Sequence, residues 1–138
     1  MRVSPSGAVL EPLSGAFDVV VAPGEDVQAA VDSCPPGGCV LLLPGTHEGP
    51  LVLLADQEVH VFGRGQAVLR ADGAVLIIRA EKATVDGVAV RCESGYGHGD
   101  CGVWINGGRM RLQACNVTSA SDACVRISGG DPILASCT

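Results

Sequence analysis

Aromatic residues are scarce in this chain, at 3% of its 138 residues, with one Trp, one Tyr and two Phe. A core must therefore be built from aliphatic side chains. Lysine is nearly absent, and the net charge of −6 argues against general nucleic-acid binding. No apolar run is long enough to cross a membrane, and Pro5, Gly7 and Pro12 interrupt residues 1–17 where a signal peptide would lie. We expect no membrane association.

The chain also lacks the cysteine pattern of a metal site. It has seven cysteines, an odd number, and contains no CxxC pair, whereas a structural zinc site needs four suitably spaced ligands. Without a secretory signal, we expect reduced, mostly buried thiols in an intracellular, cytoplasmic protein. We predict no metal and no cofactor.

A repeated pattern occurs near the end of the chain. Val103–Gly108 (VWINGG) is followed 22 residues later by Val125–Gly130 (VRISGG). Carried backwards, the repeat predicts two apolar columns that share the unequal steps 24, 27 and 22, which is typical of stacked architectures. The predicted columns are Leu54, Ile78, Ile105 and Ile127, and Val61, Val85, Leu112 and Leu134.

The segments between these columns are short, alternating and β-branched, with Gly or Asn at the corners. They predict an all-β fold, a right-handed parallel β-helix that forms a single-stranded solenoid of about five coils. We expect a loosely ordered leader at residues 1–17 and one domain at residues 18–138. Because the sequence stops in mid-coil, two interpretations stay open: a fragment of a longer solenoid, or an open end that pairs with another chain.

The first part of the domain has a recognisable order of elements. A short amphipathic helix is expected at Glu25–Cys34, a turn at Pro35–Gly38, a buried strand at Cys39–Leu43, and a second turn at Pro44–His47. This order resembles the N-terminal cap of right-handed β-helix proteins of the pectate-lyase-like kind. The resemblance implies that the helix covers the first coil and shields its edge.

Two later phrases, Asp100–Ile105 and Gly129–Leu134, resemble the carbohydrate-binding and sugar-hydrolase (CASH) domain. That domain occurs in β-helix F-box proteins, in spindle- and midbody-associated adaptors that bind Shc, and in bacterial copper-maturation proteins. The resemblance covers about residues 19–138. It implies the fold strongly and the function weakly, since the fold serves both enzymes and binding modules. The resemblance to the adaptors also implies that the protein could associate with the cytoskeleton.

Gly97–Asp100 (GHGD) is similar to the Gly-His-Gly of polygalacturonases, which supports a cluster of aspartates. Inverting hydrolysis needs two carboxylates around a water, and no such cluster is evident in the sequence. The aspartates instead fall at unrelated offsets, mostly at turns: Asp72, Asp86, Asp100, Asp122 and Asp131. We therefore predict no catalytic residues, and we interpret residues 93–100 as a long loop in which Tyr96 and His98 are candidate binding residues.

The positions just before the first column should point away from the core, because strand side chains alternate. They are Leu53, Ile77, Trp104 and Arg126. An exposed apolar strip with an aromatic residue and an arginine is typical of a recognition surface. The alternative is that the leader or a loop lies across this strip and buries it.

These observations favour a non-catalytic β-helix domain that binds or scaffolds, with a protein or peptide segment as its partner. The alternative is a polysaccharide-binding or glycan-cleaving enzyme fragment of the same fold. A third interpretation is a scaffold that associates end to end through its open C-terminal coil.

Overall fold

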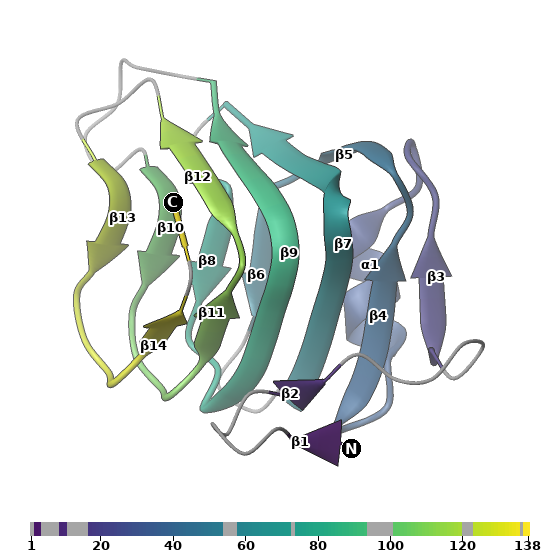
Figure 1. Ribbon diagram of the computed structural model, residues 1–138, viewed down its shortest axis with the longest axis horizontal. Coiled ribbons are helices and arrows are strands. Elements are labelled where there is room, and N and C mark those ends of the chain that lie inside the picture. Colours follow the sequence, from purple (N-terminus) through teal and green to yellow (C-terminus); the bar gives the residue numbers. More distant parts are fainter. Residues whose placement is uncertain are drawn as a thin grey trace.

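Parallel strands stack turn upon turn in the computed structural model, which is a right-handed parallel β-helix of about five turns with one short helix at its first end (Figure 1). The fold class predicted from the sequence is confirmed. The structure describes residues 2–3, 9–10, 17–53, 58–72, 74–93, 101–119, 123–135 and 137–138.

The strands form two parallel sheets that face each other across the core. The four-stranded sheet contains β6 (Leu51–Leu53), β8 (Leu76–Ile78), β10 (Cys101–Ile105) and β13 (Ala123–Ile127). The eight-stranded sheet contains β3 (Val19–Val21), β4 (Gly38–Leu42), β5 (Gly45–Glu48), β7 (Glu58–Ala71), β9 (Lys82–Cys92), β11 (Arg111–Gln113), β12 (Asn116–Ser119) and β14 (Ile133–Ala135). Near the N-terminus, β1 (Arg2–Val3) and β2 (Val9–Leu10) form a separate antiparallel pair.

Both predicted columns run along the core. Ile78, Ile105 and Ile127 occupy paired positions on β8, β10 and β13. The second column of Val61, Val85, Leu112 and Leu134 pairs in the predicted register across β7, β9, β11 and β14. Core-facing side chains lose their cover in the last coil, where Ile127 is 51% and Leu134 43% exposed, whereas Ile105 and Leu112 are 0% exposed.

The start of the first column was predicted one residue too late. Leu53, not Leu54, pairs with Ile78, and the Leu53 side chain is 0% exposed. The prediction that Leu53 points outward is therefore wrong, and Val52 takes the outward position beside Ile77. The sequence LVLL places a leucine at both candidate positions, and a slip of one residue moves a strand side chain to the opposite face. Leu54 itself lies outside the described residues.

The predicted helix is present as α1 (Val27–Ser33), and the Asp26 side chain caps it by accepting a hydrogen bond of 3.1 Å from the Ala29 backbone N–H. Val27 and Val31 are buried in the core. Gln28 continues the sheet at the open edge of β6, since its side-chain amide accepts from the Val52 N–H at 2.7 Å and donates to the Val52 carbonyl at 3.0 Å. The helix thus covers the first coil and also satisfies its edge.

Candidate binding face

One row of outward side chains crosses all four strands of the four-stranded sheet. Val52, Ile77, Trp104 and Arg126 occupy paired positions on β6, β8, β10 and β13, and we call this row the outer strip. Neighbouring strands lie about 4.8 Å apart, so the side chains succeed one another at that spacing. Val52, Ile77 and Trp104 are partly exposed, and Arg126 is exposed. Three of the four predicted strip residues are therefore brought together, and Val52 replaces Leu53.

Trp104 is held by two contacts from the next coil. Its indole N–H donates a hydrogen bond of 2.9 Å to the Ser128 hydroxyl. The guanidinium carbon of Arg126 lies 5.1 Å from the centre of the Trp104 ring, within the range of a cation–π contact. Because both contacts restrict the ring, the indole face is positioned before any ligand arrives.

A second row of polar side chains lies beside the outer strip. The parallel hydrogen-bond ladder continues past the strands, from the Asn106 N–H to the Ile78 carbonyl and from the Ser128 N–H to the Ile105 carbonyl, both at 2.8 Å. Arg79, Asn106 and Ser128 therefore occupy successive equivalent positions, two residues beyond Ile77, Trp104 and Arg126. Arg79 and Ser128 are exposed, and Asn106 is partly exposed.

This face carries positive charge in an acidic protein. The described strands of the four-stranded sheet and these second-row positions include Arg79 and Arg126 but no Asp or Glu, although the net charge of the chain is −6. No carboxylate in the described ranges lies within ion-pair distance of either guanidinium. Arg79 and Arg126 therefore offer two guanidinium groups on this face with which an anionic group can pair.

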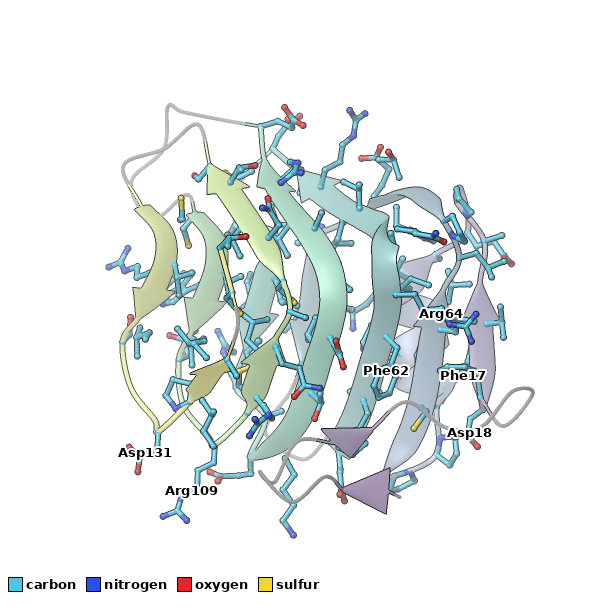
Figure 2. All side chains as sticks on the ribbon, viewed as in Figure 1. Phe17, Asp18, Phe62, Arg64, Arg109 and Asp131 are labelled. Atoms are coloured by element: carbon cyan, nitrogen blue, oxygen red, sulfur yellow. The ribbon has the colours of Figure 1, made fainter. Side chains whose placement is uncertain are left out.

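The leader packs on the opposite side of the solenoid in its described parts. The ring of Phe17 meets the ring of Phe62 on β7 edge to face, with centroids 6.0 Å apart, and the Arg64 guanidinium carbon lies 5.4 Å from the centre of the Phe17 ring. Figure 2 shows the three side chains together on the outer face of the eight-stranded sheet. In Figure 1, β1 and β2 are drawn in front of β4 and β7, away from the four-stranded sheet behind. The described leader residues therefore leave the outer strip uncovered.

Tyr96 and His98 lie outside the described residues, as do Asp100 and Asp122. The described chain leaves β9 at Glu93 and resumes at Cys101, the first residue of β10. The interpretation of this segment as a loop with binding residues stays a prediction.

The sequence analysis missed a polar cluster on the outer face of the eight-stranded sheet. There the His60 Nδ1 atom lies 2.9 Å from the Thr84 hydroxyl, and both side chains are buried. The Gln113 amide donates to Asp86 at 2.6 Å and accepts from Arg111 at 2.7 Å. Burial lowers the pKa of the His60 imidazole, whose Nε2 atom has no partner among the described residues. The sequence signal for this cluster is that polar residues alternate with the second apolar column at the same positions of β7, β9 and β11.

A shallow acidic cleft of about 530 Å³ lies where β5, β7 and β9 end. It is lined by Glu48, Asp72 and Glu93 together with Arg70, whose Nε donates to Glu48 at 2.9 Å. This hydrogen bond raises the pKa of the Arg70 guanidinium. In the described part of the chain, no three His, Cys, Asp or Glu residues converge in a way that could hold a metal ion.

The cysteines have no disulfide partners in the described structure. The Cys115 thiol donates to the Val85 carbonyl at 3.4 Å, and the Cys137 thiol makes the equivalent bond to Leu112 one coil later at 3.3 Å. Burial raises the pKa of the Cys115 thiol to about 12. The two residues therefore occupy equivalent places in successive coils as small hydrophobic side chains.

No family model matches the chain, and no curated protein matches it. A crystal structure of a pectin methylesterase variant in complex with a hexasaccharide superposes with a TM-score of 0.74, at 14% sequence identity over 88% of this chain. The fold is shared with a pectin methylesterase.

At this identity the likeness concerns the fold alone. The chain spans about half of the solved protein, since the superposition covers 48% of that chain.

Among the described residues, no helix has the length and apolar character to span a membrane.

Proposed function

We propose that the chain is a non-catalytic β-helix domain whose outer strip binds a segment of a protein partner. The observation that carries the proposal is the partly exposed Trp104 ring, held by Arg126 and Ser128 on a sheet face that the described leader residues leave uncovered. Tryptophan and arginine are enriched among the residues that dominate protein interfaces.

Rigidity supports this role. Val52, Ile77 and Trp104 lie on β6, β8 and β10, which Leu53, Ile78 and Ile105 fix from inside with 0% exposure. Arg126 lies on β13, which among the described strands pairs with β10 along one side only and whose core residue Ile127 is 51% exposed. A surface that is ordered before binding loses little conformational entropy when a ligand arrives. Ile77 and Val52 extend the strip with apolar area that a protein side chain can cover.

The chemistry of the face supports a binding role over catalysis. The described strands of the four-stranded sheet carry no Asp, Glu or His from which an acid–base pair could be built. The resemblance of Asp100–Ile105 and Gly129–Leu134 to the CASH domain agrees with an adaptor role. Exposed Cys124 and partly buried Cys34, Cys39 and Cys137 form no disulfide in the described structure, which suits the reducing interior of a cell.

A glycan is the second candidate ligand. The favouring observation is the fold likeness to a pectin methylesterase that was solved with a hexasaccharide. Trp104 would then stack on a sugar ring, and Tyr96 and His98 would contribute from the segment before β10. Cleavage of pectic glycans that is lost in His98→Ala would establish this candidate in place of the first.

A peptide-display selection on the immobilised domain tests the proposal. The recovered pool should lose binding to the double variant Trp104→Ala/Arg126→Glu and keep binding to Arg70→Gln, which removes a charge from the other sheet. Equal binding of the pool to the native domain and to the double variant would show that the partner uses another face.

A further inference from the structure

We infer that the segment bound at the outer strip is acidic and extended, with two carboxylates about four residues apart that pair with Arg79 and Arg126. The inference rests on the proposed function and adds the chemical class and geometry of the partner. It follows from the charge, the spacing and the polar groups of the two outward rows.

Charge selects the class of partner. Arg79 and Arg126 project from the four-stranded sheet without a described carboxylate within ion-pair distance, while the chain as a whole has a net charge of −6. The guanidinium carbon of Arg126 lies 5.1 Å from the centre of the Trp104 ring, and the Arg126 side chain is exposed, so its N–H donors can be reached by a ligand. A carboxylate can accept two parallel hydrogen bonds from a guanidinium group.

Spacing sets the distance between the two carboxylates. Arg79 follows β8 and Arg126 lies on β13, two coils further along the solenoid and two residues earlier in the coil. Two coils correspond to about 9.6 Å and two residues to about 6.6 Å, so the diagonal between the two backbone positions is about 12 Å. An extended peptide advances about 3.3 Å per residue, and only even separations share a face. Two carboxylates on peptide residues four apart lie about 13 Å from each other and match the diagonal between the arginines. Two carboxylates on residues two apart, at about 6.6 Å, do not match it.

The middle of this diagonal passes between Trp104 and Asn106. Asn106 is partly exposed, and its side-chain amide, which can donate and accept, is not engaged by any described residue. It suits the N–H and carbonyl of a peptide backbone. Trp104 offers its ring to an apolar side chain halfway between the two carboxylates.

The apolar end of the strip favours a peptide over an acidic polysaccharide. Val52 and Ile77 continue the row beyond Trp104 and provide no hydrogen-bonding side chain. A uronic-acid chain carries hydroxyls and a charge on every unit, and those groups would lose water there without replacement. A peptide can place an apolar residue on the same surface.

The test uses a fluorescein-labelled peptide that contains Glu-Ser-Val-Ser-Glu between Gly-Ser flanks, titrated with the whole chain at low ionic strength. Anisotropy should report binding that weakens as salt is added. The peptide of the same composition with its two glutamates adjacent to the valine, Ser-Glu-Val-Glu-Ser, should bind about tenfold more weakly, and the Gln-Ser-Val-Ser-Gln peptide weaker still.

Protein variants complete the test. Arg79→Gln and Arg126→Gln should each weaken binding about fivefold to tenfold, whereas Arg70→Gln, with the same loss of charge on the other sheet, should change it less than twofold. All three positions are exposed, and an unchanged circular dichroism spectrum would confirm folding. Arg126→Lys, which keeps the charge but not the planar fork, should recover part of the affinity.

The outcomes separate this inference from the proposed function. Equal affinity for the glutamate and glutamine peptides, or for native and Arg79→Gln protein, overturns the acidic partner. If display then yields neutral peptides that depend on Trp104, the proposed function stands without this inference. If an oligogalacturonate hexasaccharide binds while no peptide does, both are refuted and the face binds glycans.

Discussion

Replacing one isoleucine at a time along the core column tests the stacking directly. Ile105 and Ile127 are the same residue type at paired positions on β10 and β13, so Ile105→Ala and Ile127→Ala remove the same three carbon atoms. The two sites differ in burial: Ile105 is 0% exposed between Ile78 and Ile127, whereas Ile127 is 51% exposed. The difference in the free energy of unfolding between the two variants therefore measures how much burial by the next coil contributes to stability.

The magnitudes follow from this burial. Removing three buried carbon atoms costs about 2.4 kcal/mol in transfer free energy, at about 0.8 kcal/mol for each. The cavity left between two coils raises the cost of Ile105→Ala to about 4 kcal/mol. At Ile127 about half of the transfer term applies, and the vacated space opens to solvent, so we expect about 1 kcal/mol.

Urea titration provides the assay, followed by far-ultraviolet circular dichroism and by the fluorescence of Trp104, the single tryptophan, which adjoins Ile105. With a slope of about 1.5 kcal/mol per molar urea, Ile105→Ala should lower the midpoint by more than about 2 M and Ile127→Ala by less than about 1 M. Ile105→Val, at about 1 kcal/mol, keeps the comparison measurable if the alanine variant does not fold. Equal losses at the two sites would refute the stacked column.

Three further predictions follow from single side chains. Gln28→Ala should lower the free energy of unfolding by about 1–2 kcal/mol, because both hydrogen bonds to the Val52 backbone are lost together with the one to Asp32; urea midpoints check this loss. Burial lowers the pKa of the His60 imidazole, so the unfolded chain binds a proton at this residue at higher pH than the folded chain does. The free energy of unfolding should therefore fall as the pH drops below about 6.5 and level off below the folded-state pKa. A series of thermal melts across this pH range should show a flatter slope for His60→Gln. Brief treatment of the folded protein with iodoacetamide should modify exposed Cys124 and spare Cys115, whose pKa is raised to about 12 by burial; mass spectrometry that finds Cys115 alkylated as fast as Cys124 would contradict the buried position.

Much of the architecture is predictable from the sequence because each coil of a β-solenoid repeats the same order of apolar, polar and turn residues. The steps between Ile78, Ile105 and Ile127, and the matching steps of the second column, determine which strands become neighbours. The helix over the first coil is predictable from its apolar face and the Pro-Pro-Gly-Gly turn that ends it. Trp104 and Arg126 follow as outward neighbours, because alternation in a strand is strict.

Only the tertiary structure determined the register of β6, the side of the solenoid on which the described leader residues lie, and the contacts between side chains of different coils. At β6 the sequence LVLL offers a leucine for the core in either register, and only the packing of Leu53 against the stack made Val52 the outward residue. The contact of Phe17 with Phe62 directs the described leader to the eight-stranded sheet, through a pairing of residues far apart in sequence. The bond of Trp104 to Ser128 and the juxtaposition of Arg79, Asn106 and Arg126 likewise join different coils. Local patterns fix the direction of each side chain, but which side chains of different coils meet depends on loop lengths and packing, which only the folded chain determines.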